Sequence, residues 1–211
     1  DNRLDCKSYP NQDEAPEYAG DFFSPEQFVP SDGLKDSLLR PLPWEACVTT
    51  QYDSWGYRAD NDNFMNARDI IHMLVDCVSK NGNLLLNVGP DGKGRLPKTV
   101  KAVLSEVGDW MSDNGASVYG CGSVELPRPE WGRLTGDGKY IYAHFFDKIG
   151  FCAQVKGLKR EAVDYALRLA DNSEVALSGF LNAGAEYVSI YFPRADLADK
   201  NDTVVKFVLK K

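Results

Sequence analysis

The sequence predicts an α/β segment followed by an all-β segment, and three features of the chain support this division. Residues 83–88 form a short, almost continuously apolar run, as expected for a parallel strand buried on both faces. Amphipathic stretches at residues 66–80 and 97–113 flank this run, so the middle of the chain alternates helix and strand. From about residue 122, short strand-like runs separated by turns indicate an antiparallel β-sandwich.

The first part of the chain, up to about residue 62, is predicted to be irregular because it is rich in Pro, Asp, Asn and Ser. A disordered segment would be poor in aromatic side chains. We therefore interpret this region as a long loop that a rigid scaffold holds for function. Its aromatic residues are Tyr9, Tyr18, Phe22, Phe23, Phe28, Trp44, Tyr52, Trp55 and Tyr57.

Two helices are predicted from apolar side chains at helical spacing. The first ends before Gly82, and the second begins near Pro97 and ends at Gly115. One buried strand and its helices do not complete a parallel sheet, because such a strand needs neighbours on both sides. We therefore expect other polypeptide to supply the front of this domain. The apolar faces comprise Ile70, Ile71, Leu74, Val75 and Val78 in the first helix, and Val100, Val103, Leu104, Val107, Trp110 and Met111 in the second.

The all-β segment is predicted from four apolar or alternating runs at residues 140–146, 151–155, 187–192 and 204–208. Turn residues such as Gly136-Asp137-Gly138 separate these runs.

Composition excludes several classes of function. The formal net charge of -7 argues against a nucleic-acid partner, which would need excess Lys and Arg. No apolar run approaches the roughly 18–20 residues that span a bilayer, so no membrane segment is expected. The five cysteines lack the spacing of a zinc site. They are interpreted as isolated thiols, with a single disulfide through Cys6 as the alternative.

Carboxyl groups in the aromatic-rich loop are the first candidates for chemistry. They are Glu14, Glu17, Asp21, Glu26 and Glu45. Glycoside hydrolysis commonly uses two carboxyl groups across the scissile bond, one as acid/base and one as nucleophile or base. Aromatic rings around a carboxyl group would raise its pKa, as a general acid requires at neutral pH.

Four ordered blocks of the chain resemble family 29 of the glycoside hydrolases, the α-L-fucosidases. Residues 20–26 resemble the motif "GD-aromatic-x-[ST]-P-E", and residues 44–49 resemble "WE-x-C-x-T". Residues 54–57 match the "SWGY" block. Residues 78–92 resemble "VS-x-GGNLLLNIGP…DG", with Asn81 where glycine is usual.

This resemblance implies a retaining mechanism on terminal α-L-fucose, with Glu26 as the acid/base and Glu45 as the alternative acid/base. It implies substrate contacts by Arg3 and Trp55, whereas Asn87 and Gly89 are expected to shape the backbone. The two histidines, His72 and His144, are expected to be structural. No cofactor and no metal are implied, because two carboxyl groups suffice.

The fold that the resemblance implies is the C-terminal part of a (β/α)8-like barrel over residues 1–121, followed by a β-sandwich over 122–211. The family's nucleophile is an Asp in a Trp-Asn-Asp motif that this chain lacks. An N-terminal segment or a second chain is therefore expected to supply it. The family is typically secreted, periplasmic or lysosomal. Two other readings stay open: a non-catalytic carbohydrate-binding or interaction module, and a glycosidase of different sugar specificity.

Overall fold

The structure is a computed structural model that describes residues 2–4, 21–36, 38–147, 151–182, 185–192 and 199–210. Side chains are described within these ranges except at residues 2–4 and 180–185. The chain forms two compact units, Asp1–Gly108 and Asp109–Lys211. The domain boundary predicted between residues 121 and 122 follows the last helical residues of the α/β segment, and it stays a prediction.

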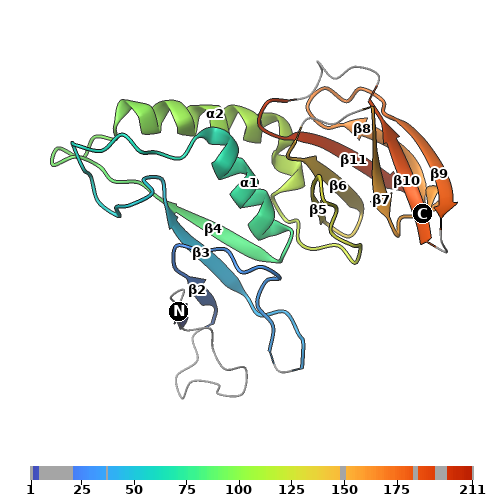
Figure 1. Ribbon diagram of the computed structural model, residues 1–211, viewed down its shortest axis with the longest axis horizontal. Coiled ribbons are helices and arrows are strands. Elements are labelled where there is room, and N and C mark those ends of the chain that lie inside the picture. The colour runs from blue at the N-terminus through green and yellow to red at the C-terminus, as the bar shows by residue number, and fades with distance from the viewer. Residues whose placement is uncertain are drawn as a thin grey trace. The chain divides into compact units, whose positions relative to one another are not determined.

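The first unit contains a four-stranded parallel sheet in the order β1-β2-β3-β4. Figure 1 labels β2, β3 and β4 of this sheet. Helix α1 connects β3 to β4, and helix α2 follows β4 along the chain. The strands are β1 (Asn2–Leu4), β2 (Phe23–Pro25), β3 (Trp44–Thr49) and β4 (Gly82–Asn87). The helices are α1 (Ala67–Val78) and α2 (Lys98–Asn114), and α2 from residue 109 on belongs to the second unit. The helix–strand alternation predicted for residues 66–113 is confirmed.

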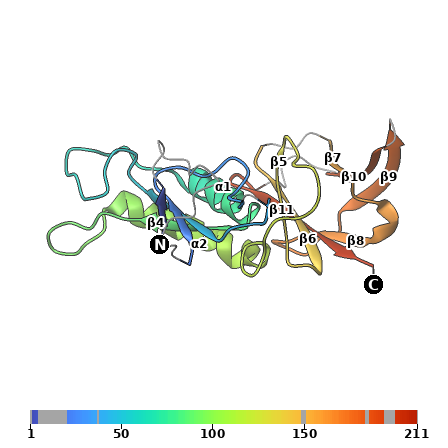
Figure 2. The same cartoon turned by 90° about the horizontal axis from the view of Figure 1, so that it is seen from below.

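Asn66 caps the N-terminus of helix α1, because its side chain accepts a hydrogen bond from the Asp69 backbone N–H at 2.9 Å. Its apolar face, with Ile70, Ile71 and Val75, is buried. Figure 2 shows α1 beside the sheet. The helix side chains and one face of the sheet form a single cluster, which includes Leu34, Trp44, Ala46, Val48, Met65, Ile70 and Cys77.

The prediction that residues 1–62 are irregular is wrong for β1, β2 and β3. From Trp44 to Val48, strand β3 alternates between buried and half-buried side chains, with Trp44, Ala46 and Val48 against the helical cluster. Strand β2 has three residues, too few for any periodicity to be read from the sequence.

The second unit contains two antiparallel sheets, with strand orders β5-β6-β11-β8 and β7-β10-β9. Short 3-10 helices, Gly115–Ser117 and Arg160–Ala162, accompany them. The strands are β5 (Gly132–Gly136), β6 (Tyr140–Phe145), β7 (Cys152–Lys156), β8 (Val163–Arg168), β9 (Ala176–Asn182), β10 (Ala185–Tyr191) and β11 (Thr203–Leu209). The four strands predicted from the sequence correspond to β6, β7, β10 and β11.

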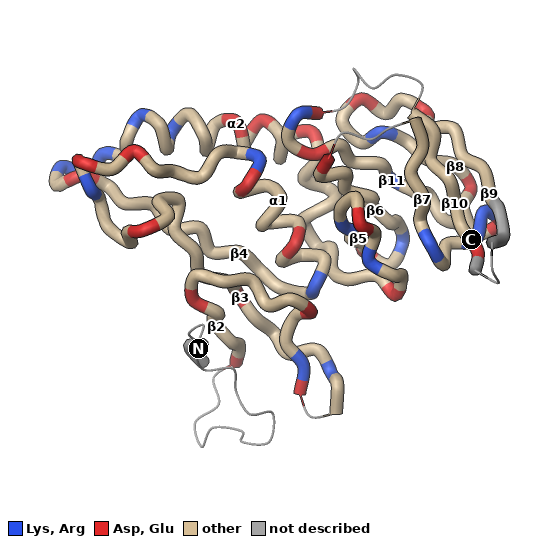
Figure 3. The backbone as a smooth tube through the Cα atoms, in the orientation of Figure 1, with Lys and Arg blue, Asp and Glu red and all other residues tan. Residues whose placement is uncertain are grey.

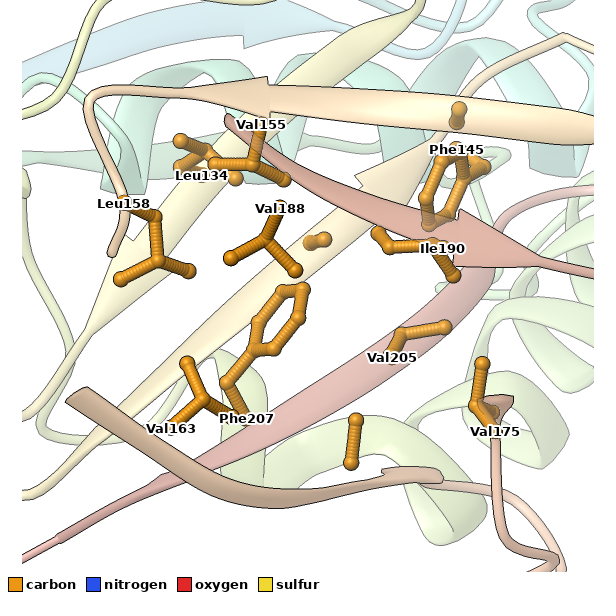
Figure 4. Close-up of a cluster of buried hydrophobic side chains, with 13 residues drawn as sticks. Leu134, Phe145, Val155, Leu158, Val163, Val175, Val188, Ile190, Val205 and Phe207 are labelled. Carbon is orange, nitrogen blue, oxygen red and sulfur yellow. The ribbon is translucent and has the colours of Figure 1, made fainter. Parts of the chain in front are cut away.

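Buried side chains from both sheets of the second unit belong to one hydrophobic cluster (Figure 4). Val155 and Val188 come from one sheet, and Leu134 and Phe207 come from the other. The three missed strands are β5, β8 and β9. Strand β5 contains Gly132, where a Cβ would lie 1.8 Å from the His144 carbonyl oxygen, so that this position requires glycine.

Lys and Arg are interspersed with Asp and Glu along the described chain (Figure 3). Among the described residues, no helix is both long enough and apolar enough to cross a membrane. Four cysteines, Cys47, Cys77, Cys121 and Cys152, are free thiols, whereas Cys6 lies outside the described residues.

Candidate active site

The carboxyl ends of β2, β3 and β4 lie at one edge of the parallel sheet, where the loops after these strands meet. A cavity of about 880 Å³ lies between the loops after β2 and β3 and helix α1. Polar and aromatic side chains line it together with apolar ones: Gln27, Phe28, Val29, Val48, Thr49, Tyr52, Asp53, Ser54, Trp55, Gly56, Met65 and Met73. Sites in parallel α/β folds form at this edge of the sheet.

Glu26 follows the last residue of β2 directly and lies opposite Cys47 of β3. Side chains alternate along a strand, so Glu26 shares a face with Cys47, opposite the face that Trp44 and Ala46 bury against helix α1. Glu26 is half-buried and does not line the cavity.

Gln27, the next residue, holds Glu26 in place through several contacts. Its backbone is in the left-handed region, with φ of 63°, which is uncommon for a residue other than glycine. Its backbone N–H donates to the Cys47 carbonyl at 2.9 Å. Its side-chain amide donates to Thr49 Oγ1 and accepts from the Thr49 N–H, both at 3.4 Å. Strained backbone of this kind is common at functional sites.

Glu45, the alternative candidate, is the second residue of β3 and pairs in register with Asn83 near the start of β4. Thr49 ends the same strand four residues later. At about 3.3 Å per residue, Glu45 lies roughly 13 Å from the carboxyl end of β3.

Trp55 lines the cavity, and its side chain is 40% exposed. Its backbone carbonyl accepts a hydrogen bond from Asn87 Nδ2 at 2.7 Å. Tyr52, on the same loop, donates from its hydroxyl to Asp69 Oδ2 at 3.1 Å. Burial, together with this bond to Asp69, raises the pKa of Tyr52 above its ordinary value.

For three further residues singled out from the sequence, the structure does not describe the side chain. The backbone of Arg3 pairs in register with Ser24, two residues before Glu26, and its side chain lies outside the described residues. Glu14 and Glu17 also lie outside them. Phe23 and Phe28, two of the loop's aromatic residues on either side of Glu26 in the sequence, pack against the helical cluster.

Sequence reasoning missed Gln27 and Thr49 as members of the site. Their contact joins positions 22 residues apart, and the only local signal was that Gln27 follows Glu26. In the part of the chain that the structure describes, no group of three or more His, Cys, Asp or Glu side chains is arranged to hold a metal ion.

The arrangement has known relatives. The family model described as "Alpha-L-fucosidase" matches residues 5–116, more than half of the 211-residue chain. The chain belongs to the α-L-fucosidase family. Plasma alpha-L-fucosidase of Rattus norvegicus is 36% identical to it over 91 residues, which cover 42% of this chain and 20% of the rat fucosidase.

Solved α-L-fucosidase structures resemble nearly all of the chain. Alpha-L-fucosidase isoenzyme 1 from Paenibacillus thiaminolyticus has a TM-score of 0.85 and 44% identity, and the match covers 92% of this chain and 46% of that one. A family 29 enzyme from Bacteroides thetaiotaomicron was solved as a trapped covalent intermediate in complex with 2-fluoro-fucosyl fluoride. Its TM-score is 0.78 at 25% identity, with coverage of 91% and 44%. The chain therefore spans less than half the length of these relatives.

Proposed function

We propose that this chain supplies the general acid/base of a retaining α-L-fucosidase that removes terminal α-L-fucose from glycoconjugates. Membership of the α-L-fucosidase family supports the sugar and the reaction class. The Bacteroides thetaiotaomicron relative, trapped as a covalent intermediate, supports retention, because a glycosyl–enzyme intermediate is the mark of the retaining route.

Glu26 is the acid/base, and the observation that carries this choice is its position directly after β2. It lies on the sheet face opposite the helical cluster, and in a closed barrel that face lines the interior. Glu45 shares the face but lies near the amino end of its strand, whereas catalytic residues of such barrels lie at the carboxyl ends.

In the proposed reaction, the Glu26 carboxyl group donates its proton to the glycosidic oxygen as the bond to fucose breaks. The aspartate nucleophile forms a bond to the anomeric carbon. The Glu26 carboxylate then removes a proton from water, whose oxygen displaces the aspartate and releases fucose. Trp55 presents its ring to the apolar face of the sugar, and Arg3 contacts fucose and the carboxylates.

The nucleophile and the missing strands are proposed to come from polypeptide outside this chain, which would close a (β/α)8-like barrel. Strand β4 ends the four-stranded order, so its outer edge has no strand partner among the described residues. Leu85 of β4, a large apolar side chain, is 44% exposed. Further strands beside β4 would pair its free backbone groups and cover Leu85. The second unit is proposed to be the β-sandwich that follows the barrel.

The test compares Glu26→Gln and Glu45→Gln in the full-length enzyme, with two kinds of substrate. On fucosyl saccharides, whose leaving group needs a proton, Glu26→Gln should lower kcat/KM by about 10²–10⁴-fold. On an aryl fucoside with a good leaving group the first step should be nearly unaffected, because no proton is needed. The Glu45→Gln variant should show no such contrast between substrates.

Two results would reject parts of this proposal. The selective loss in Glu45→Gln instead of Glu26→Gln would move the acid/base to Glu45. A full-length wild-type protein that binds fucosides without any turnover would support the non-catalytic carbohydrate-binding module.

A further inference from the structure

We propose that Asn87 and Gly89, at the end of β4, are positioning residues that set the Trp55 ring against the sugar site. This inference rests on the proposed function, in which Trp55 contacts fucose. Neither residue needs to touch the substrate, because both act on the backbone of the loop that carries Trp55.

Asn87 holds this loop through one direct hydrogen bond. Its side-chain Nδ2 donates to the Trp55 carbonyl oxygen at 2.7 Å across 32 residues of sequence. The Asn87 backbone carbonyl also accepts from the Thr50 N–H at 2.9 Å, at the start of the same loop. One residue of β4 therefore fixes both the beginning of the loop and the residue that bears the ring.

Gly89 makes an independent contact with the next peptide group. A Cβ at this position would lie 2.7 Å from both the Gly56 carbonyl carbon and the Tyr57 nitrogen. Real Cβ atoms essentially never approach this closely, and backbone atoms cannot rotate away as a side chain does. The φ of Gly89 is outside the left-handed region. Glycine is needed here because the two backbones approach each other, and not for its backbone conformation.

Among the described residues, no hydrogen bond other than that from Asn87 fixes residues 54–57 to the unit outside their loop. Its base is closed by Met65 N–H to the Thr50 carbonyl at 2.8 Å and by Gln51 Nε2 to the Asn61 carbonyl at 2.9 Å. Among the described residues, the bond from Asn87 is the one recorded hydrogen bond between residues 54–57 and anything outside the loop. No hydrogen bond or ring pair is recorded for the Trp55 indole within this part of the chain. The ring direction therefore follows its backbone.

The first test is Asn87→Leu and, separately, Gly89→Ala in the full-length enzyme. Leu has a similar shape and removes the donor, and Ala adds the clashing Cβ. A ring stacked on the sugar contributes in both the ground state and the transition state, so its displacement should raise KM and the inhibition constant of L-fucose about tenfold and change kcat less. A loss of folded enzyme would instead lower the apparent kcat and leave KM unchanged.

Gly92→Ala is the matched control, because a Cβ at Gly92 meets nothing within 4 Å and its φ is also outside the left-handed region. Its kinetic constants should equal those of the wild type. If KM rose in Gly92→Ala as much as in Gly89→Ala, the turn would tolerate no side chain at either position. That result would overturn the role proposed for the close approach of Gly89 to the Gly56–Tyr57 peptide group.

A double-mutant cycle then decides whether Asn87 acts through Trp55. In a Trp55→Ala background, Asn87→Leu should change KM less than about twofold, because the ring that it positions is gone. An undiminished tenfold effect in that background would overturn the inference and leave the fucosidase proposal intact. Absence of turnover in the wild type would contradict the proposed function, and L-fucose binding to the same variants would still test the positioning role.

Discussion

A buried histidine–carboxylate pair should determine much of the stability of the second unit. His144 of β6 and Asp202, which directly precedes β11, are both fully buried, and Nδ1 lies 2.7 Å from Asp202 Oδ2. On the other side of the ring, Nε2 lies 3.0 Å from Thr135 Oγ1. The Thr135 hydroxyl donates its one hydrogen to the Ser117 carbonyl at 2.7 Å, so its oxygen must accept from His144 Nε2. A second proton then lies between Nδ1 and the carboxylate.

Replacing Asp202 with Ala would leave this ring buried with one nitrogen unpaired. Removal of one partner from a buried ion pair costs about 3–5 kcal/mol. That is a large share of the roughly 5–15 kcal/mol by which a protein of this kind is stable. Asp202 already has one buried oxygen, Oδ1, without a hydrogen-bond partner among the described residues, so the pair is only partly compensated.

Urea unfolding followed by tryptophan fluorescence measures this loss, because the Trp110 ring lies 6.4 Å from the His144 ring and Trp110 Nε1 donates to the Asp202 carbonyl at 2.9 Å. Asp164→Ala is the control, since Asp164 is exposed in the same unit and should change stability by no more than about 0.5 kcal/mol. A fall in unfolding free energy of less than about 1 kcal/mol for Asp202→Ala would refute the argument that a proton is shared between His144 and Asp202.

Two further predictions concern helix α1 and the turn after it. Burial raises the pKa of the Cys77 thiol to about 12, so the folded protein keeps its proton after the unfolded chain loses it, and stability should fall as pH rises from about 9 to 12. The free energy of unfolding should fall by about 2 kcal/mol at pH 10.5, and by less in Cys77→Ala. Urea unfolding at pH 8 and 10.5 measures this fall in both proteins. An equal fall in the two would contradict the role of the Cys77 thiol. Asn81 has φ of 60°, which Asn and Gly tolerate, so Asn81→Ala should cost about 1 kcal/mol more than Asn81→Gly. Thermal unfolding of both variants checks this, and equal stability would show that the turn relaxes.

Sequence periodicity predicted the elements that bury one continuous face. Helix α1 was predicted because Ile70, Ile71 and Val75 recur at helical spacing, and β4 because its apolar run is bounded by turn residues. Strand β3 was missed because half-buried Glu45 and Cys47 and buried Thr49 do not form a clear polar surface pattern in a region rich in Pro and aromatic residues.

From the sequence, a residue could be assigned to the candidate site only when its own type and motif indicated a role there. Trp55 was singled out by its motif and lines the cavity, and its contact with substrate stays a prediction. The bonds of Gln27 to Thr49 and of Asn87 to Trp55 depend on strand register and on loop paths across 22 and 32 residues. Local spacing contains no information about such contacts. It also could not show that Phe23 and Phe28 pack on the face away from Glu26.

The position of Glu26, the proposed acid, is fixed by side chains that pack on the opposite face of the sheet. Strand β2 has only three residues, too few to fix Glu26 by its own ladder. Gln27 therefore clamps the end of β2 to Thr49 and Cys47 of β3, and β3 is fixed because Trp44, Ala46 and Val48 are buried against α1. A core substitution such as Val48→Ala should thus disturb Glu26 through β3. Substitutions on the exposed side of α1 have no such route to the acid.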